Sequence, residues 1–182
     1  MKVVITGHTG LEKEDFLEEV KRLSERGLEI YDLEKETQYH CKATSPFHLD
    51  QYFSKRDDFV ESRKKAFKKI LNEVKKENPL NAVLNVHATY RRKLMPFHVL
   101  DFKLLSDFRP DMLITLIDDV YRVQARIRKK AKVIADISTQ QITLKDIIEW
   151  RLDEIMLTET MANFLSSFYG RRIPHYVLPV RG

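Results

Sequence analysis

Five short apolar segments separated by helix-forming stretches are the feature that most constrains the fold of this chain. The segments are residues 2–6, 28–33, 82–86, 112–117 and 175–180. Each is short and apolar, as expected of strands buried on both faces of a sheet. Parallel neighbours need crossover connections, and the helical stretches supply them. The pattern predicts an α/β fold with a five-stranded parallel sheet and helices on both faces, in three layers.

The intervening stretches have helical periodicity of different strength. Helices are predicted over residues 13–26, 49–76, 99–107, 120–132 and 143–169. The last begins with a capping box, Thr143-Leu144-Lys145-Asp146, and ends at Gly170. Its apolar residues predict one buried stripe, formed by Leu144, Ile147, Ile148, Leu152, Ile155, Ala162, Leu165 and Phe168. Residues 34–46 show no sustained period and are predicted as a loop.

The bulk composition is typical of one cytoplasmic domain. At 182 residues and 43% hydrophobic content, the chain supports a single core over 1–182. No stretch is apolar for the roughly 18 residues that a membrane span needs. The single cysteine, Cys41, excludes an internal disulfide. Abundant Lys and Glu with few Asn and Gln are typical of proteins from hot environments, and the net charge of +5 favours anionic partners.

The segment after the first strand has the context of a phosphate-binding loop. Its sequence is Gly7-His8-Thr9-Gly10-Leu11-Glu12-Lys13-Glu14, between a strand and a helix. Gly7 and Lys13 have the spacing of the G-x-x-x-x-G-K-[ST] motif, in which backbone N–H groups and the lysine hold phosphates. Glu12 replaces the second glycine, and Glu14 replaces the Ser or Thr that would bind Mg²⁺. The same turn can also be purely structural, so the pattern alone leaves both interpretations open.

Taken together, the segments that follow the strands resemble the archaeal adenylate kinases over nearly the whole chain. The most specific stretch is 85–91, Asn-Val-His-Ala-Thr-Tyr-Arg, and 118–126 and 54–58 also match in order. The resemblance implies a P-loop nucleotide-kinase fold with strand order 2-3-1-4-5. It also implies a monophosphate-binding subregion at about 34–76 and a short lid at about 122–142.

The resemblance assigns roles to particular side chains. Lys13 would contact the β- and γ-phosphates of ATP, and Arg122 and Arg126 would clamp the transferred group. Arg56 and Arg91 would hold the acceptor phosphate. For each arginine, a solvated surface or an ordinary ion pair is an equally strong interpretation. His87 is expected to orient a loop through hydrogen bonds, while His8 and Thr9 either contact phosphate or shape the turn.

Two residues differ from the family pattern at positions that serve the same Mg²⁺ ion. Asn85 stands where the family has a metal-associated acid at the end of the third strand, and Glu14 stands at the Ser or Thr position. Under an exchange hypothesis, Glu14 binds Mg²⁺ directly and Asn85 lies in its outer shell. Under a decay hypothesis, the site has lost the cation.

The sequence leaves two alternative functions open. The first is a nucleoside monophosphate kinase that uses ATP and Mg²⁺, with AMP as acceptor. The second is a catalytically silent nucleotide sensor or assembly factor that contacts RNA or a protein through its basic helices. The lysines between residues 63 and 76 fit a nucleic-acid backbone or a solvated helix face. The sequence favours solvation because no aromatic residue is interleaved on the lysine-bearing face and no RNA-binding motif is present.

Overall fold

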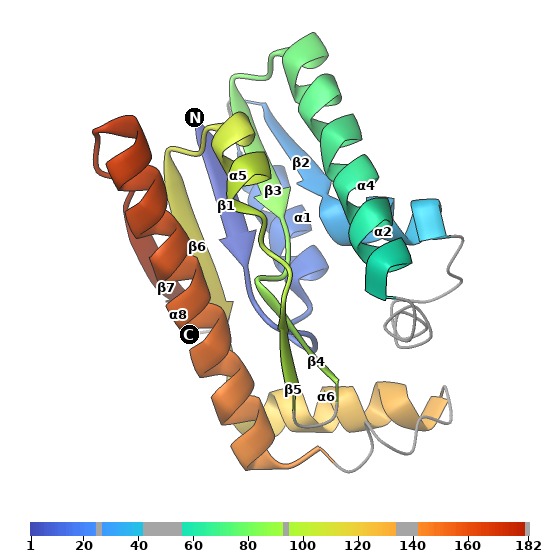
Figure 1. Cartoon of the computed structure of the whole chain (residues 1–182). Coiled ribbons are helices and arrows are strands. Elements are labelled where there is room, and N and C mark those ends of the chain that lie inside the picture. The colour runs from blue at the N-terminus through green and yellow to red at the C-terminus, as the bar shows by residue number, and fades with distance from the viewer. Residues whose placement is uncertain (25–26, 42–55, 93–94, 134–141, 181–182) are drawn as a thin grey trace.

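A parallel five-stranded sheet forms the centre of the molecule (Figure 1). The computed structural model describes residues 1–24, 27–41, 56–92, 95–133 and 142–180. The sheet strands are β1 (Lys2–Thr6), β2 (Leu28–Asp32), β3 (Asn81–Asn85), β6 (Met112–Ile117) and β7 (His175–Pro179). Their spatial order is β2-β3-β1-β6-β7. Counting only these five, this is the predicted order 2-3-1-4-5, so the predicted fold class is confirmed.

The central strand shows why apolar runs are required here. Val4 of β1 lies opposite Leu84 of β3 and Leu113 of β6 in the parallel register. All three side chains are fully buried. A strand covered on both faces cannot alternate apolar with polar residues, and this accounts for the continuous apolar runs in the sequence.

Helices cover both faces of the sheet (Figure 1). Their bounds are α1 (Lys13–Leu23), α2 (Leu33–Cys41), α4 (Arg56–Glu77), α5 (Phe102–Phe108), α6 (Val120–Val133) and α8 (Leu144–Tyr169). One core cluster joins α4, α5 and α8 to the sheet through residues such as Phe67, Phe108 and Leu165. A second joins α1 and α6 to the sheet, with Leu17 and Ile127 among its members. The result is the predicted three-layer arrangement.

Two segments differ from the sequence prediction. The predicted loop at 34–46 is wrong for its first part, because α2 occupies residues 33–41. Leu33, Thr37 and Cys41 are buried at a spacing of four residues, a stripe too short to stand out in a polar sequence. Residues 42–46 lie outside the described part. The segment after β3 forms an antiparallel hairpin of β4 (Thr89–Arg92) and β5 (Met95–His98).

The helix α8 has the predicted ends but a different buried face. Its capping box is present, since Thr143 Oγ1 accepts from the amide of Asp146 while Asp146 Oδ2 accepts from the amide of Thr143. Gly170 ends it with φ 61°. The buried residues are Ile147, Trp150, Glu154, Thr158, Ala162 and Leu165. Ile148, Leu152 and Phe168, which the sequence places inside, are 45%, 50% and 63% exposed.

The helix is rotated because polar side chains are needed on its inner face. Glu154 and Thr158 bond buried groups at the ends of the strands, so the stripe that contains them turns inward. Among the described helices, none combines the length and the apolar character needed to cross a bilayer.

The orientation of α8 predicts unequal effects of the same substitution at two positions. Leu165→Ala removes a fully buried side chain and should lower the free energy of unfolding by about 2–5 kcal/mol. Leu152→Ala changes a half-exposed side chain and should cost less than about 1 kcal/mol. Urea denaturation followed by circular dichroism measures both. Equal losses would contradict the observed rotation of the helix.

Candidate functional site

The loop between β1 and α1 packs tightly against α6 and needs both of its glycines. Gly7 has φ 145°, and a Cβ there would lie 2.7 Å from Leu11 Cδ1 and 3.0 Å from the carbonyl oxygen of Leu116. Gly10 has φ 90°, and a Cβ there would lie 2.7 Å from Ile127 Cγ1. Side chains larger than hydrogen would therefore clash as well as strain the backbone.

Glu12 keeps the backbone conformation of a glycine at the place where the motif has its second glycine. Its φ and ψ are 53° and 46°, in the left-handed region, which costs a residue with a Cβ about 1–2 kcal/mol. Its carboxylate does not stand uncompensated, because Oε2 lies 3.2 Å from Nε of Arg126. Strain held at such a position is a sign that the surrounding structure requires this turn.

Arg126 connects the loop to the end of β6. Its Nη1 donates to the carbonyl oxygen of Gly10 at 3.1 Å and to Asp118 Oδ2 at 2.7 Å. The residue predicted to clamp a transferred phosphoryl group thus lies at the loop and is bound to protein groups. Arg122, one turn earlier on α6, has an exposed side chain.

Lys13 is a buried ammonium group with an uncharged partner. The side chain is 3% exposed, and Nζ donates to the carbonyl oxygen of Val86 at 2.6 Å. Within the described residues, no carboxylate oxygen lies within 4 Å of Nζ. Burial lowers the pKa of the Lys13 ammonium, while Glu154, Glu34 and other nearby carboxylates act in the opposite direction.

Glu154 joins the two turns that meet at this edge of the sheet. Oε1 accepts from the amides of Gly7 at 2.9 Å and Ala88 at 2.7 Å. Oε2 accepts from the amide of Thr89 at 2.7 Å and from its hydroxyl at 2.6 Å. Burial raises the pKa of Glu154, and the bonds from Thr89 and Ala88 and the charge of Lys13 oppose that shift.

A chain of hydroxyl groups continues from Glu154 into the sheet. Thr158 lies one turn later on α8, and its Oγ1 lies 2.9 Å from that of Thr6. Thr6 in turn lies 2.9 Å from the hydroxyl of Thr115 on β6. The sequence interpretation passed over Glu154 and Thr158. They continue at a spacing of four residues between Trp150 and Ala162, and this spacing was the signal that placed them on the buried stripe.

Two histidines, one buried and one of intermediate exposure, shape the same region. His8 is 1% exposed, its Nδ1 lies 2.8 Å from the carbonyl oxygen of Thr9, and its ring lies 5.5 Å from that of Trp150. Burial lowers the pKa of His8 to about 4. His87 Nδ1 lies 2.5 Å from the carbonyl oxygen of Gly7, and burial holds the pKa of His87 well below its usual value. Both rings are neutral near pH 7.

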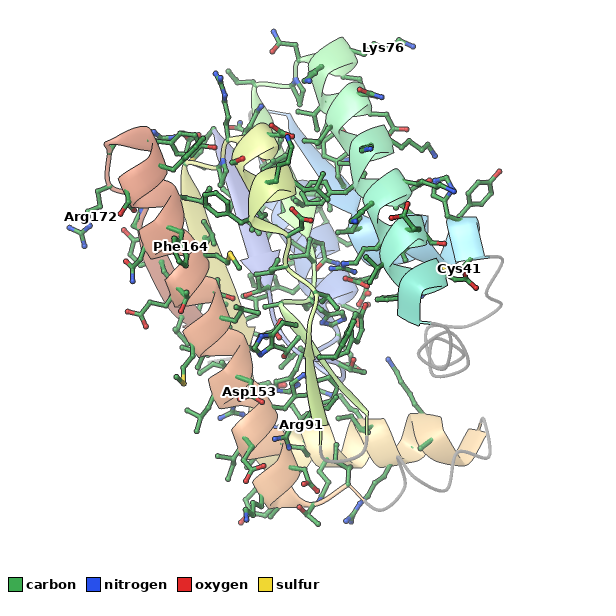
Figure 2. The ribbon with its side chains drawn as sticks, viewed as in Figure 1. Cys41, Lys76, Arg91, Asp153, Phe164 and Arg172 are labelled. Carbon is green, nitrogen blue, oxygen red and sulfur yellow. The ribbon has the colours of Figure 1, made fainter. Side chains whose placement is uncertain are left out.

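Arg91 lies between β4 and α8 among three carboxylates. Nη2 donates to Glu149 at 2.8 Å, and its guanidinium nitrogens lie 3.8 Å from Asp146 and 3.7 Å from Asp153. Figure 2 shows Arg91 and Asp153 near the lower end of α8. The predicted acceptor-phosphate ligand is thus held by acidic groups of this helix. The side chain of Arg56 lies outside the described part of the structure.

The two residues assigned to a cation differ in their surroundings. Asn85 is fully buried, its Nδ2 donates to Asp32 Oδ2 at 2.9 Å, and its Oδ1 has no hydrogen-bond partner among the described atoms. Glu14 is exposed at the first turn of α1. In the described residues, no three His, Cys, Asp or Glu side chains gather as a metal site. Mg²⁺ at nucleotide sites is bound mainly by phosphates and water with one or two protein oxygens. Glu14 and Asn85 each offer an oxygen of the kind that Mg²⁺ binds, and among the described residues no hydrogen bond joins the two.

The role of Glu154 predicts a large loss of stability in Glu154→Gln. Each carboxylate oxygen accepts two hydrogen bonds, so an NH₂ group in either place would face two donors. We expect the free energy of unfolding to fall by about 2–5 kcal/mol in urea denaturation. Glu159→Gln changes an exposed carboxylate on the same helix and should change the value by less than about 0.5 kcal/mol. Similar values for the two variants would contradict the assigned role.

Comparison with known proteins gives similarity in structure and none in sequence. No protein-family model matches the sequence, and no curated protein matches it. Shikimate kinase from Bacteroides thetaiotaomicron superposes with a TM-score of 0.51 at 12% identity, covering 96% of this chain and 85% of that chain. A chain of the PezAT toxin–antitoxin system of Streptococcus pneumoniae aligns with a TM-score of 0.45 at 11% identity, covering 87% of this chain and 65% of that chain.

The sheet order and the superposition on shikimate kinase agree with each other. At this level of identity the likeness concerns the fold alone. The chain has the α/β fold of the P-loop kinases.

Proposed function

We propose that this protein is a P-loop phosphotransferase that transfers the γ-phosphoryl group of ATP to a nucleoside monophosphate, with AMP as the acceptor. The fold is that of P-loop kinases, and the choice of acceptor depends on the resemblance of residues 85–91 and 118–126 to the archaeal adenylate kinases. The altered loop makes slow turnover the expected behaviour.

The surroundings of Lys13 are the observation that supports this proposal most. Taking an ammonium group out of water costs on the order of several kcal/mol, and proteins normally offset that cost with a carboxylate. In the described structure, the only hydrogen-bond partner of Lys13 Nζ is the carbonyl oxygen of Val86. A polyphosphate at the loop would provide an anion in direct contact with the ammonium group, and the helix N-terminus beside it would add positive potential.

Binding would require several groups to exchange partners. Arg126 would leave Glu12 or Asp118 to reach the transferred phosphoryl group, and Arg122 would join it from the exposed face of α6. Arg91 would exchange a carboxylate of α8 for the acceptor phosphate, with Arg56 as its companion. Each exchange replaces one charge-assisted contact by another, so the net gain in binding free energy is small. We expect slow turnover for this reason.

The cation would be held directly by Glu14 and the phosphates, with Asn85 in its outer shell. When bound, Mg²⁺ offsets the charge on the phosphates during transfer. The contribution of the chain is separate: it positions the two nucleotides in line and excludes water from them.

A second candidate, a nucleotide-binding protein without turnover, is favoured by the Glu12–Arg126 ion pair. This pair engages the arginine that catalysis would need. It also leaves a carboxylate beside the phosphates, where it repels them.

A coupled assay for ADP formation from ATP, AMP and Mg²⁺ tests the proposal. Wild type should form ADP above background, and Lys13→Ala should reduce the rate at least about 100-fold. Lys21→Ala removes an exposed lysine of the same helix and should leave the rate unchanged. No ADP formation by wild type, or equal rates for the two lysine variants, would contradict the proposal.

The double substitution Glu12→Gly with Glu14→Ser separates the two candidates. If the wild type is silent because the loop has decayed, the double variant should gain ADP formation that Lys13→Ala then abolishes. If Glu14 serves the cation, the double variant should lose activity relative to wild type.

A further inference from the structure

We propose that the exposed face of α4 binds single-stranded nucleic acid. The face is formed by Lys65, Lys68, Lys69, Lys75 and Lys76, here called the lysine face, with Tyr39 of α2 beside it. All five lysines are exposed. At 1.5 Å per residue, Lys65 and Lys76 are separated by roughly 16 Å along the helix axis. Figure 2 shows Lys76 extending outward at the end of α4.

Most of this positive charge is not neutralised within the described residues. Lys69 is the exception, because its Nζ lies 2.8 Å from Glu36 and 3.8 Å from Glu73. In the described ranges, Lys65, Lys68, Lys75 and Lys76 have no carboxylate oxygen within 4 Å. A row of uncompensated cations along one helix attracts a polyanion.

The fold brings the aromatic ring of Tyr39 next to the lysine face, although the two are far apart in the sequence. Tyr39 is 75% exposed, and Lys69 Nζ lies 5.6 Å from the centre of its ring. The two residues also line a hollow of about 360 Å³ between β2, α2 and α4, together with Lys35 and the acidic residues Asp32, Glu36 and Glu73. Although Tyr39 is 30 residues from Lys69 in the sequence, the fold places it at the edge of the lysine face.

Cations beside an exposed ring fit a single strand better than the alternatives. Single-strand binders combine a basic path for the backbone with an aromatic ring on which a base stacks. In a duplex the bases are already stacked on one another and cannot reach the ring. An acidic protein segment would gain the charge attraction but has no base to stack on Tyr39.

The lysine face is separate from the loop after β1. Because α4 leads into β3, its C-terminal half lies toward the amino edge of the sheet (Figure 1). The phosphate-binding loop lies at the carboxyl edge. Nucleic-acid binding therefore does not depend on the proposed phosphotransfer, and Lys13→Ala should leave it unchanged.

Fluorescence anisotropy with a labelled 12-nucleotide single-stranded RNA tests the proposal. The logarithm of the affinity should fall with the logarithm of salt concentration, with a slope of about −2 to −3 for three or four neutralised phosphates. The triple substitution Lys65→Ala, Lys68→Ala and Lys76→Ala should make the slope shallower by about 2. Tyr39→Ala should weaken binding about 5-fold to 150-fold without changing the slope.

Matched controls separate the lysine face from general charge attraction. Replacing Arg128, Lys129 and Lys130 of α6 by alanine removes the same charge elsewhere and should have little effect. Equal weakening by both triple variants would overturn the proposal. Equal affinity for duplex RNA together with no effect of Tyr39→Ala would also overturn it. If a polyglutamate peptide competes as well as RNA does, the face serves an acidic protein and the proposal fails.

Discussion

The buried carboxylate of Glu154 is the constraint on which the rest of this site depends. Its two oxygens accept hydrogen bonds from the amides of Gly7, Ala88 and Thr89 and from the hydroxyl of Thr89. Those donors lie in turns that follow two different strands, and without an acceptor they would be buried unpaired. One side chain of α8 thus fixes the relative position of the loop after β1 and of the turn that leads to Arg91. The inward polar stripe of α8 and the exposure of Leu152 follow from this requirement.

The loop itself keeps its shape although its sequence departs from the motif. Gly7 and Gly10 remain where a Cβ would clash, and Glu12 holds the left-handed conformation with its charge opposed by Arg126. In the described structure, Lys13 has one uncharged hydrogen-bond partner. These observations support an anion site. Without a ligand, its cationic side chains contact groups of the protein itself, and a bound anion would take the place of those groups. The same observations explain how a loop with Glu12 in place of the motif's second glycine can keep the backbone path that a glycine allows.

The sequence predicted the sheet and most helices because each depends on local patterns, whereas the strand order came from the resemblance to the archaeal adenylate kinases. The strands are continuous apolar runs, and α8 carries its capping box and terminal glycine within its own sequence. Glu154 was missed because a glutamate near Asp153 and Arg151 looks exposed until its hydrogen-bond donors, more than 60 residues away, are known. The ion pair of Arg126 with Glu12 and the carboxylates around Arg91 depend on tertiary contacts in the same way. So does the position of Tyr39 beside the lysine face.

Isothermal titration of ATP into wild type and into Lys13→Met, with and without Mg²⁺, tests most directly whether the loop is an anion site. We expect wild type to bind ATP and Lys13→Met to lose at least about tenfold in affinity, because the substitution removes the buried charge and keeps the length of the side chain. Mg²⁺ should strengthen binding by wild type if Glu14 and Asn85 serve the cation. If wild type does not bind ATP, or if both proteins bind with the same affinity, the central claim is contradicted.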